Sequence, residues 1–105
     1  IINYQYILGY LVSFEVYMII TKRFNRFISY VGYAKSSVKR LNLHNKSKGA
    51  KFTKGNHWKL IYKKKYLTKS LAMKEEYKLK KNYKLRKSLV KKYIIKNENC
   101  NFTTL

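Results

Sequence analysis

The chain has 105 residues and carries 25 Lys and Arg against four acidic residues, which gives a formal net charge of +21. A charge of this density repels itself in a compact chain, so it excludes a protein that works without an acidic partner such as nucleic acid or an anionic membrane surface. The four Glu, two His and one Cys are too few and too scattered for a catalytic or metal-binding arrangement, so we predict no enzymatic activity, no cofactor and no metal.

Residues 1–21 form a neutral, apolar first segment without Lys or Arg. The first 20 residues have the length of a membrane span, and basic residues follow them directly. Glu15 lies within the stretch and opposes insertion into a bilayer. We therefore predict a segment packed against protein, with a transmembrane helix as the alternative.

Residues 22–41 show a helical period. Apolar residues recur at steps of three and four and form one stripe, while basic residues lie largely off it. The stripe consists of Phe24, Phe27, Ile28, Val31, Ala34, Val38 and Leu41. This pattern predicts an amphipathic helix with its apolar side on protein and its basic side on phosphate or in solvent.

Residues 42–57 lose this period and are rich in Lys, Asn, Ser and Gly. Such a segment buries too little apolar surface to offset its ordering entropy, so we predict a basic loop or arm. Phosphate contacts would order the arm among RNA helices. A flexible linker is the competing interpretation.

Residues 58–105 combine an aromatic and basic segment with a long helix and a short polar tail. Trp58, Tyr62 and Tyr66 stand at helical spacing, which is more typical of core packing than of base stacking. Ser70 is the predicted N-cap of a basic amphipathic helix that runs to about residue 96. Glu75 and Glu76 are adjacent on this helix, and we interpret both as ion-pair partners of neighbouring Lys.

These elements predict a mostly α fold, a small extended helical protein with a long C-terminal amphipathic helix, a basic irregular arm and little independent core. The cations of the helices and the arm are the predicted contacts to RNA phosphates. They are Lys22, Arg23, Arg26, Lys39, Arg40, Lys46, Lys48, Lys51, Lys54, Lys63, Lys64, Lys80, Lys84, Arg86, Lys87 and Lys91.

The run KKNYKLRKSL at residues 80–89, followed by Asn97, Glu98 and Asn99, resembles the N-terminal helix of organellar small-subunit ribosomal protein family fourteen. The similarity covers roughly residues 73–101, and the family's Arg-rich second half has no counterpart. The resemblance implies binding to rRNA in the head of the small subunit, with Tyr83, Arg86 and Lys87 as rRNA-facing or packing positions.

We therefore expect a structural constituent of the mitochondrial ribosome, with rRNA as its main partner. Neighbouring ribosomal proteins would contact residues 1–20 and the apolar helix faces. Lys outnumbers Arg by 21 to four and Asp and Pro are absent, a composition that suits an AT-rich organelle genome and a matrix location. The alternative is a small membrane subunit of a mitochondrial respiratory or ATP synthase complex, with residues 1–20 as its span.

Overall fold

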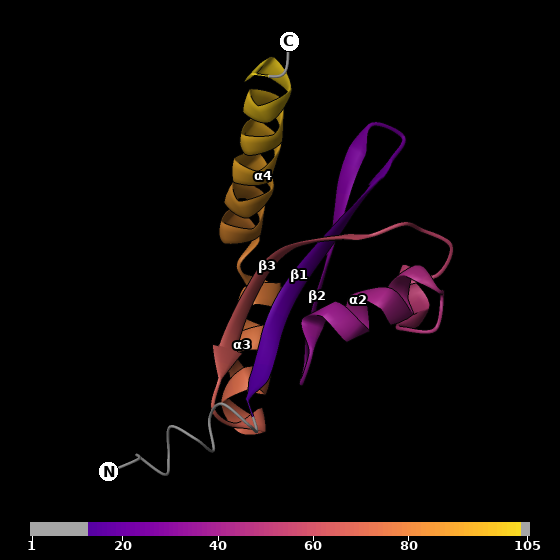
Figure 1. The fold of residues 1–105 in the computed structure, drawn as a ribbon. Helices are drawn as coiled ribbons and strands as arrows, with labels where there is room; N and C mark the ends of the chain where they lie inside the picture. Colours follow the sequence, from indigo (N-terminus) through magenta and orange to yellow (C-terminus); the bar gives the residue numbers. More distant parts are fainter. Residues whose placement is uncertain (1–12, 104–105) are drawn as a thin grey trace.

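The computed structural model describes residues 13–103, which form a three-stranded antiparallel sheet with helices on both faces (Figure 1). The strand order is β2-β1-β3, so β1 is central and β2 is an edge strand. The elements in chain order are β1 (Phe14–Arg23), β2 (Arg26–Ala34), α2 (Ser37–Asn45), the 3-10 turn η1 (Lys51–Thr53), β3 (Lys59–Tyr66), α3 (Lys69–Lys81) and α4 (Tyr83–Thr103).

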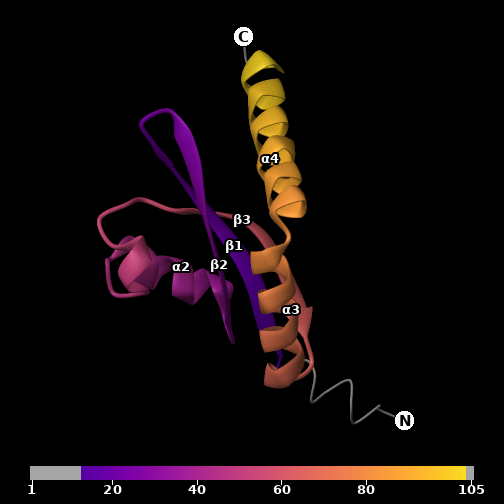
Figure 2. The ribbon, with the colours of Figure 1, turned by 180° about the vertical axis from the view of Figure 1, so that it is seen from behind.

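The central strand β1 is apolar on both of its faces because both faces are covered. Val16, Met18 and Ile20 point to one face and join Ala72 and Leu79 of α3 in a core that Leu89, Val90 and Tyr93 of α4 extend. The alternate residues Tyr17 and Ile19 point to the other face and pack with Trp58, next to Leu41 of α2. Figure 2 shows α3 lying across the face of the sheet opposite to α2.

Side-chain caps set the helix boundaries. Ser36 Oγ accepts a hydrogen bond from the Lys39 amide at the start of α2, and Thr68 Oγ1 accepts one from the Leu71 amide at the start of α3. Asn82 ends α3, and its side chain accepts from the Leu85 amide at the start of α4. The predicted helix over residues 71–96 is thus two helices joined at Asn82, and the N-cap of the first is Thr68 instead of Ser70.

The mostly α fold class predicted from the sequence is wrong, because residues 14–34 and 59–66 form the sheet. Within residues 22–41, only the part from Ser37 onward is helical, and it belongs to α2. The apolar stripe was misleading because β2 has neighbours on both faces, which removes the alternation expected of a half-exposed strand. The aromatic spacing of residues 58–66 likewise belongs to β3.

The turn between β1 and β2 places two residues in the left-handed region. Phe24 has φ 49° and Asn25 has φ 64°, a combination that matches the tight hairpin turns in which Asn and Gly are preferred. Asn tolerates this conformation well, whereas a left-handed residue of Phe's bulk costs about 1–2 kcal/mol. Phe24 is also 93% exposed, so no burial offsets this cost.

Residues 42–57, predicted to form a free basic arm, are hydrogen-bonded to Trp58, the residue that precedes β3. The Asn45 side chain accepts a hydrogen bond of 2.6 Å from the Trp58 amide and donates one of 3.1 Å to the Trp58 carbonyl oxygen. The Trp58 indole donates to the Thr53 carbonyl oxygen at 2.9 Å. These bonds give the loop a fixed course without nucleic acid.

The first 12 residues of the predicted apolar segment lie outside the described residues. The remainder of that segment forms β1, where it packs inside its own chain. Across residues 13–103, no helix has the length and apolar character needed to span a bilayer.

Candidate active site

A cleft of about 570 Å³ opens at the edge strand β2, where β1, β2, α2 and α3 converge. Residues from both faces of the sheet line it, because the cleft wraps around the end of the sheet. Its polar and aromatic lining includes Tyr17, Tyr30, Tyr33, Lys35, Arg40, Lys69 and Glu76, and Gly32 and Ala34 form its β2 floor.

Tyr17 and His44 form a buried pair behind this cleft. The two side chains come from β1 and α2, and Tyr17 Oη lies 2.8 Å from His44 Nε2. On its other side, His44 Nδ1 lies 2.8 Å from Thr53 Oγ1, and Thr53 Oγ1 donates its proton to the Ala50 carbonyl oxygen at 2.8 Å. Since the threonine proton is used, His44 Nδ1–H must donate to Thr53, which leaves Nε2 as the acceptor of the Tyr17 hydroxyl proton.

Two glycines make room for this pair. A Cβ at Gly32 would lie 2.5 Å from Tyr17 Oη and 2.7 Å from Tyr17 Cζ, because Gly32 is the ladder partner of Tyr17 and the ring crosses over it. A Cβ at Gly49 would collide with His44 Nδ1. Both contacts are closer than a Cβ atom tolerates, so only glycine at positions 32 and 49 leaves space for the tyrosine ring and the imidazole.

Burial and neighbouring groups shift the protonation of the pair. Burial, together with the nearby Tyr30, raises the pKa of Tyr17 to about 12, although Arg40 partly offsets the effect. Burial, with a further contribution from the Arg40 cation, lowers the pKa of His44 below its usual 6.5. The Tyr30 ring packs edge-on against His44, with 5.0 Å between ring centroids. At neutral pH the pair therefore consists of a protonated tyrosine and a neutral histidine.

Glu15 fixes the start of α2, and with it the placement of Arg40 and His44. The buried Glu15 Oε1 accepts hydrogen bonds from the Ser37 amide at 2.8 Å and from the Ser37 hydroxyl at 3.1 Å. A carboxylate at a helix N-terminus also interacts favourably with the helix dipole. Glu15 is thus bound in a structural role outside the cleft.

Glu76, which lies on α3, supplies the carboxylate of the cleft. Its Oε1 contacts Lys80 Nζ at 2.9 Å, one helical turn along. Glu75 pairs instead with Lys78 at 3.3 Å and does not line the cleft. The predicted ion pairs of Glu75 and Glu76 with nearby Lys are confirmed. The sequence did not indicate that Glu76 also lines the cleft.

The cleft offers one carboxylate to a metal ion. Among residues 13–97, whose side chains the structure describes, no three His, Cys, Asp or Glu side chains lie close enough together to form a complete cage. This donor set suits Mg²⁺, which keeps several waters and is bound through one or two carboxylates together with substrate phosphates. It does not suit structural zinc, which needs a closed set of four ligands.

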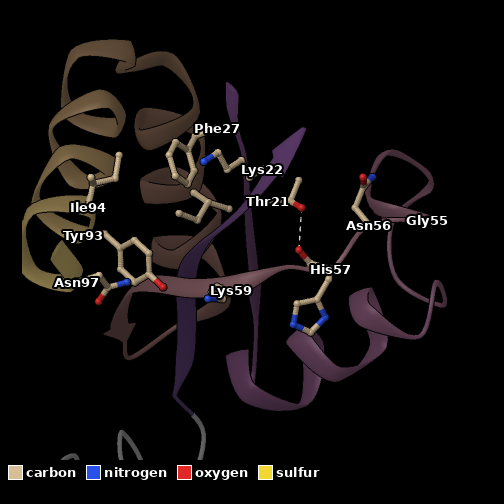
Figure 3. Close-up of a pocket in the computed structure, with 11 residues that line it drawn as sticks. Thr21, Lys22, Phe27, Gly55, Asn56, His57, Lys59, Tyr93, Ile94 and Asn97 are labelled. Atoms are coloured by element: carbon tan, nitrogen blue, oxygen red, sulfur yellow. Dashed lines mark hydrogen bonds between the residues drawn. The ribbon is translucent and has the colours of Figure 1, made fainter. Parts of the chain in front are cut away.

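A second cleft, also about 570 Å³, lies between the hairpin, α4 and the loop before β3 (Figure 3). Thr21 Oγ1 donates to the His57 carbonyl oxygen across it at 2.7 Å, and Tyr93, Ile94 and Asn97 of α4 close its other side. Its lining residues include no carboxylate and no paired acid and base. Of these two clefts, the one at the β2 edge is therefore the stronger candidate active site.

The structure distributes the predicted RNA contacts over the whole surface. Only Arg40 lines the cleft, and Lys80 touches it through Glu76. Arg26, Arg86, Lys87 and Lys91 line a separate groove between β2 and α4, and Lys22 and Arg23 lie at the hairpin end of β1. The others are exposed along α2, the loop after it, β3 and α4, namely Lys39, Lys46, Lys48, Lys51, Lys54, Lys63, Lys64 and Lys84.

Comparison with known proteins identifies the kind of domain. The GIY-YIG catalytic domain matches residues 14–89, well over half of the chain. A UPF0213 protein of Oceanobacillus iheyensis is 43% identical over 51 residues, which cover 48% of this chain and 59% of that protein. UPF0213 proteins of Staphylococcus epidermidis and Staphylococcus aureus are 47% and 45% identical over 51 residues, again 48% of this chain and 62% of each relative. No solved structure matches.

These findings overturn the functional predictions made from the sequence. The ribosomal protein resemblance, the rRNA and ribosomal partners and the alternative membrane subunit are wrong, since the match is to a nuclease-type catalytic domain. The expectation that the chain is no enzyme is wrong for the same reason. The relatives are bacterial, which corrects the predicted mitochondrial location.

Sequence reasoning missed Tyr17, Tyr30, Gly32, His44 and Glu76 as a site. The family name records two tripeptides, and this chain has Tyr30-Val31-Gly32 at the second. At the first it has Glu15-Val16-Tyr17, which keeps the β-branched centre and the final tyrosine but replaces the glycine by Glu15. The pattern that could have indicated the site is Tyr30 two residues before Gly32, with Tyr17 placed 13 residues earlier in a stretch rich in β-branched residues.

Proposed function

Because the chain belongs to the GIY-YIG catalytic domain family, we propose that it hydrolyses phosphodiester bonds in DNA. The observation that carries this proposal is the oriented Tyr17–His44–Thr53 chain of hydrogen bonds behind a cleft that also holds Arg40 and Glu76. The net charge of +21 supports a polyanionic substrate. The matched segment covers about 60% of the relatives' length, so the activity is proposed for the domain that this chain contains.

Tyr17 is the proposed general base through its link to His44. Because its pKa is raised to about 12, the hydroxyl is protonated at neutral pH and can accept a proton only while giving one up. An attacking water would transfer its proton to Tyr17 Oη as the tyrosine proton moves to His44 Nε2. The water oxygen then bonds to phosphorus as the bond between phosphorus and the leaving oxygen breaks. The leaving oxygen takes a proton from solvent, and the His44 imidazolium returns its proton to solvent. General base catalysis of this kind contributes about 10²–10⁴-fold in rate.

Arg40 is positioned to stabilise the negative charge that develops on the phosphate. Its guanidinium lies on α2 at the cleft, close enough to affect the pKa of both Tyr17 and His44. A planar guanidinium matches the geometry of two phosphate oxygens. Removing one such charge-stabilising donor typically slows an enzyme by about 10²–10³-fold.

Glu76 would hold a divalent cation in the cleft, with substrate phosphate and waters completing its ligands. When bound, such a cation polarises a phosphoryl oxygen and neutralises charge on the leaving group. Lys80 occupies one oxygen of the carboxylate, Oε1, and keeps the side chain directed along α3.

Nicking of supercoiled plasmid DNA in the presence of Mg²⁺ tests the proposal. We expect the wild-type chain to nick the plasmid and Glu76→Gln to lose at least about 100-fold in rate, because several kcal/mol of transition-state stabilisation is lost. Glu75→Gln is the matched control, since it removes the adjacent carboxylate from the same helix outside the cleft. The control should nick at the wild-type rate.

Two outcomes would refute the proposal. A purified, folded wild-type chain that leaves plasmid and oligonucleotide duplexes intact with Mg²⁺ and Mn²⁺ would exclude the activity. Equal nicking by wild type, Glu76→Gln and Glu75→Gln would show that the cleft is not where the reaction takes place.

A further inference from the structure

The tip of the β1–β2 hairpin presents an aromatic ring that the fold itself does not use. Phe24 is 93% exposed and stands in the left-handed conformation, where a small residue is favoured. Phe27, on the other side of the turn, is 41% exposed, and Lys22 Nζ lies 5.7 Å above its ring. Neither core packing nor turn geometry explains a phenylalanine at this tip.

Beside the hairpin lies a groove of about 390 Å³ between β2 and α4. Its lining includes four cations, Arg26, Arg86, Lys87 and Lys91, and no carboxylate. Arg86 stacks over the Tyr83 ring at 5.9 Å, and its Nε is buried without a hydrogen-bond partner among the described residues. An oriented guanidinium with an unused buried donor, surrounded by like charges, favours an anionic ligand.

The acidic side chains among residues 13–97 do not neutralise this groove. Glu15 is bound to Ser37, Glu75 to Lys78 and Glu76 to Lys80, all on other elements. α4 and the hairpin project in the same direction from the sheet (Figures 1 and 2). The groove lies between β2 and α4, and Phe27 of the hairpin lines it.

The groove and the cleft are separate, but both lie along the same edge strand. β2 is the edge of the sheet, and its residues Tyr30 and Gly32 line the cleft while Arg26 and Ser29 line the groove. The six residue steps from Arg26 to Gly32 span about 20 Å, at roughly 3.3 Å per step. One nucleic-acid strand covers that distance in about six nucleotides.

We infer that the hairpin and α4 form a second DNA contact, in which phosphates occupy the groove and Phe24 inserts against the bases. The inference rests on the proposed function and extends its substrate site by about six nucleotides along β2. Apolar side chains are used in this way to unstack a base step, and aromatic rings stack on exposed bases of any sequence. An exposed ring among cations also suits an anionic membrane. The concave, cation-lined groove on the same strand as the cleft favours DNA.

Binding of a fluorescent duplex to the Glu76→Gln protein, in which cleavage is suppressed, tests the groove. The triple variant Arg26→Gln, Lys87→Gln and Lys91→Gln removes three exposed groove cations and leaves Arg86 in place. We expect at least a tenfold loss of affinity and a salt-dependence slope smaller by about 2.7, at roughly 0.9 per phosphate contact. The control triple Lys46→Gln, Lys48→Gln and Lys54→Gln removes the same charge from the exposed loop after α2 and should lose much less.

Phe24→Gly tests the wedge and separates binding from folding. Glycine relieves the left-handed backbone, so the melting temperature should stay equal or rise. The affinity should nevertheless fall by about tenfold with an unchanged salt slope, since stacking carries no charge. A 2-aminopurine base placed about six nucleotides from the cleavage point should brighten with wild type and with Phe24→Trp, but not with Phe24→Gly.

The inference is overturned if the groove triple and the control triple bind DNA with equal affinity. It is also overturned if Phe24→Gly keeps full affinity and the full 2-aminopurine signal. In either case, nicking by the wild-type chain leaves the proposed function intact. If the groove triple and Phe24→Gly lose binding to vesicles of phosphatidylcholine and phosphatidylserine but keep their binding to DNA, the inference is overturned in favour of a membrane contact. If the wild-type chain neither binds nor nicks DNA, both proposals fail together.

Discussion

Replacing Gly32 by Ala disturbs the Tyr17–His44 pair without changing either side chain. The added Cβ would lie 2.5 Å from Tyr17 Oη and 2.7 Å from Cζ. Tyr17 is 1% exposed and packs with Ile19 and Trp58, so its ring cannot swing away freely. The substitution must push the tyrosine hydroxyl off His44 Nε2 or spread β1 from β2.

The expected cost follows from these contacts. Overpacking of a filled core costs about 1–3 kcal/mol, and loss of a buried hydrogen bond adds about 0.5–1.5 kcal/mol. Together they predict about 2–4 kcal/mol of lost stability, or a fall in melting temperature of roughly 10–25 °C for a domain of this size. Rates of DNA cleavage should fall by at least about tenfold under conditions where the variant is folded, because Tyr17 loses its proton acceptor.

Circular dichroism melting and the NMR tautomer signals of His44 provide the two readouts. Gly55→Ala is the control, since a Cβ there meets nothing within 4 Å but the φ of +79° is strained for alanine. It should lose about 1–2 kcal/mol of stability and keep the His44 signals and the activity. If Gly32→Ala melts within about 0.5 kcal/mol of wild type with unchanged His44 signals, the close packing that we assign to this pair is refuted.

The remaining predictions concern the cleft and its supports. Since the folded-state pKa of His44 lies below 6.5, the unfolded chain binds its proton first, so stability should fall as pH drops from about 6.5 through the folded-state pKa. Melting curves of His44→Gln should lack this fall and those of His57→Gln should retain it; an identical fall in both would contradict the burial of His44. Arg40→Lys should keep the charge yet reduce the cleavage rate at least about tenfold, because a single ammonium cannot make the paired contact; a wild-type rate would exclude that role. Asn45→Ala should cost about 2 kcal/mol in chemical denaturation through its two bonds to Trp58, and a cost below about 0.5 kcal/mol would show that the loop is held by other contacts.

The charge of the sequence predicted a polyanionic ligand, which agrees with the DNA substrate that we propose, but the sequence did not indicate the fold. A charge of +21 with few acidic residues requires a polyanion whatever the arrangement of the chain. The strands were missed because β1 is buried on both faces, so that its residues from Val16 to Ile20 lack the alternation by which a half-exposed strand is recognised. In β2, Phe27, Ile28 and Val31 mimic helical spacing although they face different sides of a sheet.

The site was hidden for a different reason. Its side chains come from four separate elements, and no two of Tyr17, Tyr30, Arg40 and Glu76 stand at a spacing that carries chemistry by itself. His44 looked like a polar residue in a basic loop, and only the fold shows it buried between Tyr17 and Thr53. Arg40 was included among the predicted RNA contacts because of its charge, without any indication that it differs from the other cations.

The single-turnover rate of Tyr17→Phe on duplex DNA with Mg²⁺ tests the central claim most directly. Tyr62→Phe is the matched control, because Tyr62 lies on β3 and packs in the core on the other face of the sheet. Our account predicts that Tyr17→Phe binds DNA as tightly as wild type but cleaves it about 10²–10⁴-fold more slowly, while Tyr62→Phe cleaves normally. Cleavage by Tyr17→Phe at the wild-type rate would contradict it.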